Sequence, residues 1–510
     1  MKKLIFFLIP FFILLIASSN FFSQSLNIIW DKCYGGSMMD KSWNCCKVFD
    51  DGFVLAALSQ SNDYDVHINR GDFDFYIVRI KNNGDTLWTR TFGGSNIDLG
   101  GEVTFTDDSC IVYTGVSYSS DFDILNTWGG GDIFAIKLDI NGNTIWKKSY
   151  GGSSMDDPYS IVSTINGGCA ILGYSYSSDY YFNQCYGNSD LILLNLDQNG
   201  DTIWVKNYGG TLSDIGNEIY YTNDNGFIIL ATSSSTNFDI GNNYGSSDFW
   251  LLKLDSLGNI EWERNYGGTD ADEGISVIQT NDGGYLMAGM TSSTDIDIHG
   301  NHGDTDFLII KTNAIGDTIW TNTLGGSDYD RPESIIQTSD YNFVVAGYTN
   351  STDGDISNHY NSDDYWIVKL DNNGQLLWNV CLGGNYSDQC TNILETYDNY
   401  LLASGFTVST SEWIDPQHGN GDVWAVKFDF IDNKDEINKT VKLLIFPNPT
   451  DNRLFIKLNG ITNVKIIDIF GKLIFESKET ELDINMIPKG IYIMIVNTEK
   501  QVFTEKIIVE

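Results

Sequence analysis

A tryptophan recurs every 58 residues along most of this chain of 510 residues. The series is Trp30, Trp88, Trp146, Trp204, Trp262, Trp320 and Trp378. A Gly-Gly pair keeps the same spacing from Gly35-Gly36 to Gly383-Gly384, and a series of aspartates keeps it from Asp74 to Asp422. Seven copies without an insertion or a deletion predict a repeat architecture, in which each copy is one structural unit.

Each copy contains four runs of residues that are typical of β-strands. In the fifth copy these runs are residues 260–265, 274–280, 285–290 and 306–311, separated by segments rich in Gly, Asn and Asp. Such segments form turns, and helical periodicity is absent. Four strands in each of seven copies predict an all-β protein with a seven-bladed β-propeller, because radial repetition protects strand edges. We expect the 274–280 run to be innermost and the tryptophan run to be outermost.

The phase of the repeat at the two ends of the predicted propeller (residues 25–431) indicates how the ring closes. A tryptophan run at residues 27–34 precedes the first Gly-Gly pair, and the last copy stops after a run at residues 422–428. The lone N-terminal strand is therefore expected to complete the last blade, with one strand from one end of the propeller and three from the other.

Residues 1–24 have the pattern of a secretory signal peptide. Lys2 and Lys3 precede an apolar run at residues 4–16, and small residues follow it. An apolar run of this length is too short to span a bilayer comfortably. The first cysteine, Cys33, lies too far downstream for a lipid anchor, and no later stretch is apolar enough for a transmembrane helix.

The net charge of the chain limits the classes of molecule that it is expected to bind. The chain has 68 acidic and 30 basic side chains, a formal net charge of −38. Nucleic acids and anionic membranes are therefore not expected as partners, because both would be repelled. A hydrophobic content of 42% excludes disorder of the whole chain, since a large core is available.

Residues 432–441 have the composition of an exposed linker, and residues 442–510 are predicted to form a small β-sandwich of short alternating strands. This segment contains Phe446-Pro447-Asn448-Pro449, a run from Lys465 to Lys472 and a run from Ile487 to Tyr492. With these motifs it resembles the type A C-terminal sorting domain of the type IX secretion system. The resemblance implies handling by that machinery, passage through the outer membrane, and release or attachment at the cell surface.

The repeated copies resemble an extracellular β-propeller repeat. In that repeat a Gly-Gly…Asp turn leads to a strand, an aliphatic strand and a Gly-x-Thr-x-Ser segment, as in Gly325 to Asp330 and Phe343 to Ser351 here. The resemblance covers roughly residues 28–430. It implies a fold and carries no activity with it.

An identical aspartate follows each Gly-Gly pair by four residues. These aspartates are Asp40, Asp98, Asp156, Asp214, Asp272, Asp330 and Asp388. Seven carboxylates at one end of the central channel would suit a cation or the hydroxyls of a sugar. Alternatively, each Asp accepts hydrogen bonds from its own turn and the neighbouring blade. Identity in all copies favours this second interpretation, because a ligand seldom needs sevenfold chemistry.

Paired aspartates recur in the long loop before the third strand of several copies. Asp295 with Asp297, and Asp353 with Asp355, are candidate ligands for Ca²⁺, which prefers several oxygen ligands. Asp also initiates turns, so a solvated loop is the alternative. No other cofactor is indicated. His299 and His302 lie among these aspartates and could instead join a transition-metal site.

Flat side chains occupy one position of this loop in nearly every copy. They are Trp128, Tyr186, Tyr244, His302, Tyr360 and His418, and Arg70 stands at the equivalent place in the first copy. A flat side chain at this point could simply pack before the glycine that follows it. If these side chains are exposed, they would suit stacking against sugar rings.

Eight cysteines in an exported protein allow disulfides, with 105 possible pairings. The pairs considered are Cys33 with Cys381, which share a repeat phase, Cys33 with Cys45 or Cys46, Cys381 with Cys390, and Cys169 with Cys185. Adjacent outer strands are a difficult place for a bridge, because bridged Cα atoms must lie within about 7 Å.

The sequence favours a secreted or surface-displayed, non-enzymatic module for binding or adhesion, with glycan or another extracellular polymer as its partner. Catalytic centres need a few unequal groups placed together, whereas the recurring residues here are equal around a ring. No catalytic residue is predicted. The alternatives are a hydrolase or lyase acting on polysaccharide at the acidic face, and a structural surface protein. Any site is expected in residues that break the repeat, mainly in the loops equivalent to residues 61–73.

Overall fold

The structure is a computed structural model of the chain. It describes residues 25–431 except 126, 183, 184, 358, 360, 361, 411–413 and 416, and in the C-terminal part residues 444–446, 453–457, 461–468, 472–484, 486–498 and 502–509. The predicted signal peptide and linker lie outside the described residues. The chain divides into two compact units, Leu26–Asp429 and a unit that contains the C-terminal residues from Phe430.

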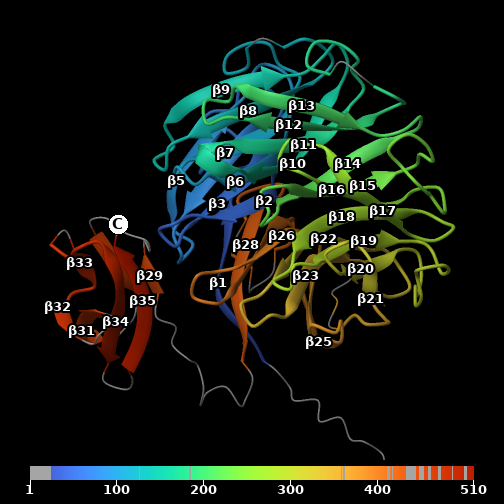
Figure 1. Ribbon diagram of the computed structural model, residues 1–510. Helices are drawn as coiled ribbons and strands as arrows, with labels where there is room; N and C mark the ends of the chain where they lie inside the picture. Colours follow the sequence, from blue (N-terminus) through green and yellow to red (C-terminus); the bar gives the residue numbers. More distant parts are fainter. Residues whose placement is uncertain are drawn as a thin grey trace, which may run out of the picture. The chain divides into compact units, whose positions relative to one another are not determined.

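Seven four-stranded antiparallel sheets make up the larger unit within the described residues (Figure 1). The first blade consists of β2 (Asp40–Lys47), β3 (Phe53–Ser59), β4 (Asp74–Ile80) and β5 (Thr86–Phe92). The second blade is β6 (Asp98–Phe105), β7 (Ile111–Ser117), β8 (Asp132–Leu138) and β9 (Thr144–Tyr150), and the third is β10 (Asp156–Ser163), β11 (Cys169–Ser175), β12 (Asp190–Leu196) and β13 (Thr202–Tyr208). The fourth is β14 (Asp214–Tyr221), β15 (Phe227–Ser233), β16 (Asp248–Leu254) and β17 (Ile260–Tyr266), and the fifth is β18 (Asp272–Gln279), β19 (Tyr285–Thr291), β20 (Asp306–Thr312) and β21 (Thr318–Leu324). The sixth is β22 (Asp330–Gln337), β23 (Phe343–Thr349), β24 (Asp364–Leu370) and β25 (Leu376–Leu382). The seventh is β26 (Asp388–Glu395), β27 (Leu401–Thr407), β28 (Asp422–Ile431) and β1 (Ser25–Tyr34). The predicted seven-bladed propeller is confirmed.

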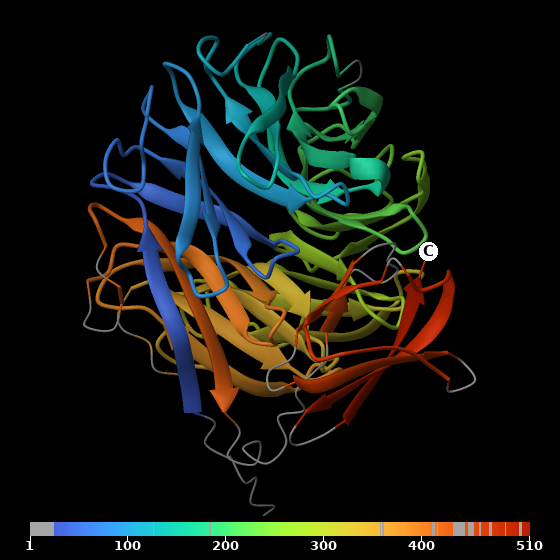
Figure 2. The same cartoon turned by 90° about the vertical axis from the view of Figure 1, so that its left-hand side faces the viewer.

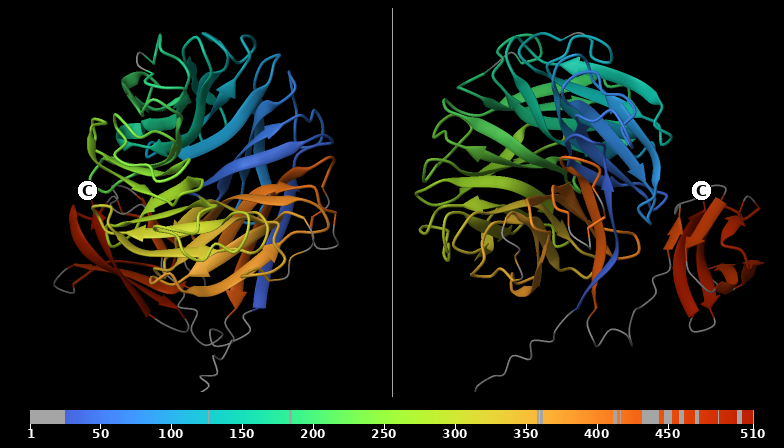
Figure 3. Two further views of the ribbon diagram at one scale, coloured as in Figure 1. Left: turned by 90° about the vertical axis from the view of Figure 1, so that its right-hand side faces the viewer. Right: turned by 180° about the vertical axis from the view of Figure 1, so that it is seen from behind.

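The order of strands within a blade also agrees with the prediction. The first strands of neighbouring blades contact one another all the way round the ring, so β2 lies between β6 and β26. The colours in Figure 3 follow this circuit of blades. In the first blade the second and third strands, β3 and β4, are buried along their whole length. The tryptophan strand is the last of each sheet and therefore the outermost.

The N-terminal strand closes the ring as predicted. Strand β1 lies beside β28 and is the fourth strand of the last blade (Figure 2). The Asp31 carboxylate links the two ends of the propeller, because its Oδ2 accepts a hydrogen bond from the backbone N–H of Asp415 at 2.7 Å and one from Trp424 Nε1 at 3.4 Å.

Six of the repeated tryptophans, from Trp30 to Trp320, pack against a turn of the next blade. The Trp146 indole is representative: its Nε1 donates to the Gln198 carbonyl at 2.9 Å. A β-carbon placed on Gly200 would lie 3.0 Å from the same indole, and Gly200 has φ of +73°. The same contact between tryptophan and glycine recurs at Gly84, Gly142, Gly258, Gly316 and Gly374. Only glycine satisfies both the backbone and the space at these turns.

This interlock makes a testable prediction about two glycines. Gly283 has a similar φ of +83°, but nothing lies within 4 Å of its added β-carbon. Alanine at either position costs about 1–2 kcal/mol for the left-handed backbone, and at Gly200 overpacking adds about 1–3 kcal/mol. We expect Gly200→Ala to lower the free energy of unfolding in urea more than Gly283→Ala does. Equal losses would contradict the interlock.

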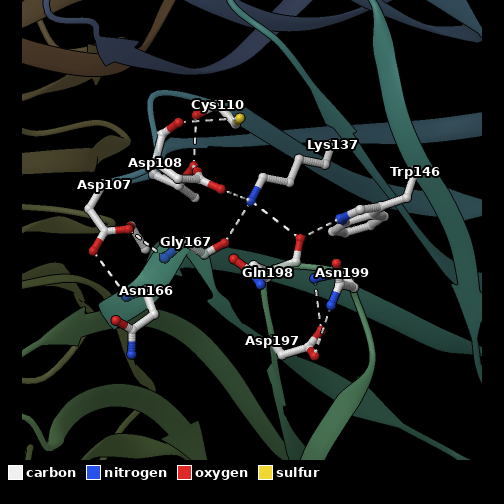
Figure 4. A network of polar contacts seen from close by, with 12 residues as sticks. Asp107, Asp108, Cys110, Lys137, Trp146, Asn166, Gly167, Asp197, Gln198 and Asn199 are labelled. Carbon is white, nitrogen blue, oxygen red and sulfur yellow. Dashed lines mark hydrogen bonds and ion pairs between the residues drawn. The ribbon is translucent and has the colours of Figure 1, made fainter.

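A buried cation ties neighbouring blades together on the side of the short turns (Figure 4). Lys137 is 1% exposed, and its Nζ lies 2.7 Å from Asp108 Oδ2 and 2.7 Å from the Gly167 carbonyl of the next blade. The equivalent pairs are Arg79 with Asp50, Lys253 with Asp224, Lys311 with Asp282, Lys369 with Asp340, and Lys427 with Asp398. In the third blade both partners change together, to Asn195 and Asn166. The change avoids leaving one charge buried alone.

The C-terminal unit contains two sheets among its described residues. One is β29 (Leu444–Phe446), β30 (Arg453–Lys457) and β33 (Glu481–Asp483); the other is β32 (Leu473–Ser477), β31 (Ile461–Asp468), β34 (Gly490–Thr498) and β35 (Val502–Val509). Alternate residues of β34 are buried, including Met494 and Val496. They pack in one core with Leu454 and Leu482 from the smaller sheet. Two sheets that share a core form the predicted sandwich.

The eight cysteines are all free thiols. None of the pairings allowed by the sequence is therefore formed, from Cys33 with Cys381 to Cys169 with Cys185. Because Cys33 and Cys381 share a repeat phase, they lie in the outer strands of two different blades. Each of the two residues is buried there. Cys33 Sγ, for example, contacts the Asp415 carbonyl at 3.2 Å. Among the described residues, helices of the length and apolarity needed to cross a membrane are absent.

Candidate binding sites on the loop face and in the channel

The long loops and the Gly-Gly turns share one face of the propeller, which we call the loop face. In the first repeat it comprises residues 60–73 and 93–97, and the short turns such as 81–85 lie on the opposite, turn face. Hydrogen bonds join the two kinds of segment: the Ser95 N–H donates to Asp121 Oδ1 at 2.8 Å. The candidate residues of the sequence analysis all belong to the loop face.

The seven aspartates that follow the Gly-Gly pairs begin the innermost strands, and we call them the inner aspartates. All seven are 0% exposed. Asp156 Oδ2 accepts hydrogen bonds from the Gly152 N–H at 2.6 Å and from Ser177 Oγ at 3.0 Å. The others make the same contacts with their own Gly and Ser. The structure therefore places these carboxylates inside the turns and not on the wall of the channel.

A second series of buried aspartates begins the third strands, and we call them the third-strand aspartates. Asp132 Oδ2 accepts a hydrogen bond from the Trp128 N–H at 2.7 Å, but its Oδ1 has no partner among the described residues. A β-carbon on Gly151 would touch this Oδ1 and would lie 3.0 Å from Asp156 Oδ2 of the next blade. Each seam thus brings two carboxylates together around a glycine. Burial raises the pKa of Asp132 to about 6, and the charge of Asp156 adds to the shift.

The loop aspartates considered for calcium have hydrogen-bonded positions. Asp295 Oδ1 accepts from the Thr269 N–H at 2.9 Å, and Asp353 Oδ1 accepts from the Ser327 N–H at 2.8 Å. Asp355 Oδ2 accepts from the Gly325 N–H at 3.3 Å, and burial raises the pKa of Asp297. Three of the four therefore cap Gly-Gly turns of their own blades. Groups of three or more His, Cys, Asp or Glu side chains able to hold a metal are absent from the described residues.

The flat residues of the loops lie at the seams between blades. The backbone N–H of each donates to the third-strand aspartate four residues later, and the described members are Trp128, Tyr186, Tyr244, His302 and His418. Tyr360 lies outside the described residues. Tyr244 is 44% exposed, and the His302 side chain is 42% exposed with Nδ1 2.8 Å from Asp306 Oδ2. These side chains are therefore not hidden in the core.

Four of these seams carry a second flat side chain from the loop of the next blade. The ring centroids of Tyr186 and Phe238 are 5.2 Å apart and stacked, those of His418 and Tyr64 are 4.9 Å apart, and those of Trp128 and Tyr180 are 6.4 Å apart. The Arg70 guanidinium lies 5.5 Å from the Phe122 ring. We call these four contacts the rim pairs.

The second member of each rim pair is exposed in a backbone conformation that large residues seldom adopt. Tyr64 is 65% exposed, Phe122 62%, Tyr180 62% and Phe238 67%, with φ between +50° and +60°. Ile296 shares this conformation in the fifth blade. An L-residue in the left-handed region costs about 1–2 kcal/mol. Repeated strain that presents an aromatic ring to solvent indicates function, because strain collects at functional sites.

Sequence reasoning found the first member of three rim pairs, namely Trp128, Tyr186 and His418, gave Arg70 only as the exception at this position, and missed all four second members. A signal was available: an aromatic residue stands between two acidic residues in Asp63-Tyr64-Asp65, and again in Asp121-Phe122-Asp123 one repeat later. The residue joined to Trp128 lies 52 positions away, in the following copy. Comparison of equivalent positions in the copies does not identify such partners.

The central channel holds a cavity of about 390 Å³. Its wall comes from the innermost strands of all seven blades and from the loop-face residues Tyr118 and Met155. Each innermost strand contains a β-bulge, which in β10 leaves Tyr159 as the extra residue. A bulge re-aims side chains, here toward the channel. The wall includes Trp43, Tyr159 and four carboxylates, so its groups are unequal.

The carboxylates of this channel cavity are Glu102, Asp157, Glu218 and Glu333. Burial raises the pKa of Asp157 and of Glu218 to about 7. Burial also raises the pKa of Glu102, and the charge of Glu218 contributes. Glu333 is paired with Arg331, whose Nε lies 2.8 Å from its Oε1. Sequence reasoning placed the site in the loops and missed this cavity, although the position shared by Glu102 and Glu218 carries Asn or Ser in the other copies.

The C-terminal unit matches a known protein family. Residues 444–510 match the family model of the secretion system C-terminal sorting domain. These residues form a type IX secretion sorting domain. The sorting domain makes this protein a secreted or outer-surface protein of the type IX pathway.

The chain also resembles several known proteins at low sequence identity. Regulatory protein FlaEY of Caulobacter vibrioides is 27% identical over 165 residues, which are 30% of this chain and 17% of FlaEY. The chain thus spans less than a fifth of that relative. Among solved structures, the Pan2 WD40 domain of Neurospora crassa has a TM-score of 0.44 and 10% identity, covering 78% of this chain and 95% of that one. NanB sialidase of Streptococcus pneumoniae has a TM-score of 0.38 and 10% identity, covering 80% and 71%.

Proposed function

We propose that this secreted protein is a non-enzymatic module that binds glycan or a similar extracellular polymer across the loop face of its propeller. The observation that carries the proposal is the set of rim pairs, in which strained backbone presents aromatic rings to solvent at successive seams. Residues 1–24 are proposed to direct export from the cytoplasm, and the sorting domain to direct the final step.

The chemistry of a rim pair matches the two sides of a sugar ring. A pyranose has an apolar face that stacks on an aromatic ring and an edge of hydroxyls that donates hydrogen bonds. At the seam of Trp128 and Tyr180, Asp179 directly precedes the exposed Tyr180, and its Oδ1 accepts a hydrogen bond from the Ser153 N–H at 2.8 Å. Acceptors next to apolar rings suit a neutral, hydroxyl-rich polymer. The acidic surface repels anionic polymers.

Several rim pairs on one ring supply multivalency. Successive seams repeat the same arrangement at fixed spacing around the propeller, so one polymer can engage more than one pair. Each contact can be weak, because a second contact on the same polymer forms at a high effective concentration. A polymer should therefore bind more tightly than its monosaccharide.

The test removes two exposed rings and measures retention on insoluble polysaccharides. Tyr180→Ala combined with Phe238→Ala should weaken retention about tenfold, because each stacked ring contributes about 0.5–1.5 kcal/mol. Tyr341→Ala is the matched control, since Tyr341 is 58% exposed with φ of +67° but lies on the turn face. Equal retention of both variants, or retention by no polysaccharide in a broad panel, would contradict the proposal.

A polysaccharide-active hydrolase or lyase is the second candidate. The observation in its favour is that Asp157 and Glu218 line one cavity and have pKa values raised by burial to about 7, which suits a general acid. Release of reducing ends or unsaturated products from the same panel, abolished by Glu218→Gln, would support the enzyme. Retention without any product would support the binding module.

A further inference from the structure

The channel cavity is lined by more carboxyl groups than its own basic side chains pair with. Four carboxylates line it, and Arg331 is the basic residue among its lining residues. Arg331 is already engaged, with Nε 2.8 Å from Glu333 and Nη2 3.2 Å from Glu273. Glu102, Asp157 and Glu218 have no ion pair among the described residues.

Two of the three carboxylates without an ion pair, Glu102 and Glu218, accept short hydrogen bonds from neutral donors. The Asn44 side-chain amide donates to Glu102 Oε2 at 2.6 Å, and the Val277 backbone N–H donates to Glu218 Oε2 at 2.6 Å. These bonds fix one oxygen of Glu102 and one of Glu218 and bring no positive charge to either group. They come from separate blades and do not gather into a metal-binding group, so their field is spread over the cavity. A spread negative field suits an organic cation better than a metal ion, which needs ligands converging on one point.

Aromatic rings line the same cavity. Trp43, Tyr118 and Tyr159 are 39%, 37% and 43% exposed and belong to its wall. The protein's own Lys41 already illustrates the chemistry, because its Nζ lies 4.5 Å from the centre of the Trp43 ring. Aromatic faces together with carboxylates attract ammonium groups through cation–π and ionic contacts. A neutral sugar cannot make the ionic contact that an ammonium group makes here, and an anion would be repelled.

We propose that the channel cavity is a second binding site, which takes a small molecule carrying primary ammonium groups. Its volume lies within the range of small-molecule pockets. The ammonium group lies between Glu102 and Glu218, and an adjoining part of the ligand packs on Trp43 or Tyr159. This site is separate from the rim pairs and does not depend on the proposed polymer binding.

The groups that govern the pH dependence all line or border the cavity. The groups with shifted pKa values are Glu102, Asp157, Glu218, Glu333, Lys41, Arg331 and the hydroxyls of Tyr118, Tyr159 and Tyr174, and the Glu273 carboxylate lies beside Arg331. Asp157 and Glu218 change charge near pH 7, whereas the tyrosines and basic groups keep theirs between pH 5.5 and 8. A bound cation favours the ionised carboxylates, so binding releases protons and tightens as the pH rises through 7.

The test is isothermal titration of the full exported chain with spermidine, whose primary amines stay charged over this pH range. We expect binding that is stronger at pH 8 than at pH 5.5 and about tenfold weaker in both Glu218→Gln and Glu102→Gln. Glu261→Gln, in outer strand β17, is the matched control and should bind normally. 1,8-Octanediol, a neutral chain of similar length, should not bind.

Two results would overturn the inference. One is absence of spermidine binding in the wild-type chain at millimolar concentration. The other is binding that all three variants share equally and that 0.3 M salt removes, because such binding reflects only the acidic surface. Thermal melts of each variant establish that it is folded before titration. Polysaccharide retention is measured on the same samples, so failure at the channel cavity is distinguished from failure at the rim.

Discussion

A chain that begins at residue 35 should lose the stability of the closed ring, whereas a chain that begins at residue 25 should keep it. Deletion of β1 exposes the edge of β28 and leaves the last blade with three strands. It also removes contacts with the first blade: Trp30 Nε1 donates to the Asn82 carbonyl at 2.9 Å, and the Tyr34 hydroxyl donates to the Gly84 carbonyl at 2.7 Å. Both ends of the ring are released at once. We expect the melting temperature to fall by about 10 °C or more.

Two controls distinguish the effect of opening the ring from the effect of losing single side-chain contacts in β1. Lys32→Ala removes an exposed ion pair with Asp85 and should shift stability by less than about 1 kcal/mol. A synthetic peptide of residues 25–36 added to the shortened chain should restore the melting temperature, because the clasp is non-covalent. If the shortened chain melts like the longer one, β1 does not close the ring.

The ring and its closure were predictable because a strict spacing carries geometric information. Seven tryptophans at one interval fix the number of units, and a strand-like run left over at residues 27–34 has one place to pair. The outermost place of the tryptophan run was likewise predicted, and there Trp146 donates to the Gln198 carbonyl of the next blade. These features depend on backbone topology, which a repeat transmits without knowledge of side-chain partners.

The sites were less predictable because they depend on which residues meet across a seam or around a bulge. Trp128 could be proposed as a stacking residue, but its partner Tyr180 belongs to the next copy and to an unusual backbone conformation. The bulge at Tyr159 decides which residues of β10 line the channel, and no periodicity reports it. The cysteines show the reverse error, since Cys33 and Cys381 share a phase without being bonded.

The second prediction with a large expected effect is the pH dependence of the free energy of unfolding. Its direction is opposite to that of ordinary acid denaturation. Burial raises to about 6 the pKa of Asp40, Asp74, Asp132, Asp190, Asp248 and Asp330. In the unfolded chain an Asp titrates near 3.9. The folded state therefore binds more protons between about pH 4 and pH 6, so the free energy of unfolding falls as the pH rises through this window. Asp157 and Glu218, whose pKa burial raises to about 7, extend the fall to neutral pH.

The opposite trend takes over in stronger acid. Although burial opposes it, hydrogen bonds from Thr222 and Lys253 lower the pKa of Asp224 to about 2. Such a carboxylate stabilises the fold above the unfolded pKa and loses that contribution as the pH falls toward 2. Stability should therefore be greatest between about pH 4 and pH 5. Urea denaturation at unit steps from pH 3 to pH 8 measures this profile, and a maximum at neutral pH would contradict it.

One seam allows this charge effect to be isolated. Asp132→Asn keeps an oxygen for the Trp128 N–H and places an amide, which can donate to Asp156 Oδ2, beside Gly151. We expect this variant to be more stable than wild type at pH 7.5 by about 1–3 kcal/mol, because an unpaired buried charge is removed, and to be nearly unchanged at pH 4.5. The gain should appear in urea denaturation with or without chelator.

The partner aspartate provides the matched control. Asp156 accepts hydrogen bonds from Gly152, Ser175 and Ser177, so Asp156→Asn loses an acceptor and should be destabilised at both pH values. If Asp132→Asn is instead less stable at pH 7.5, and wild type loses the difference in chelator, the seam carboxylates hold a cation. Two residues identical in every described blade would then differ in role: the inner aspartate accepts hydrogen bonds within its turn, and the third-strand aspartate carries the charge that the seam must neutralise.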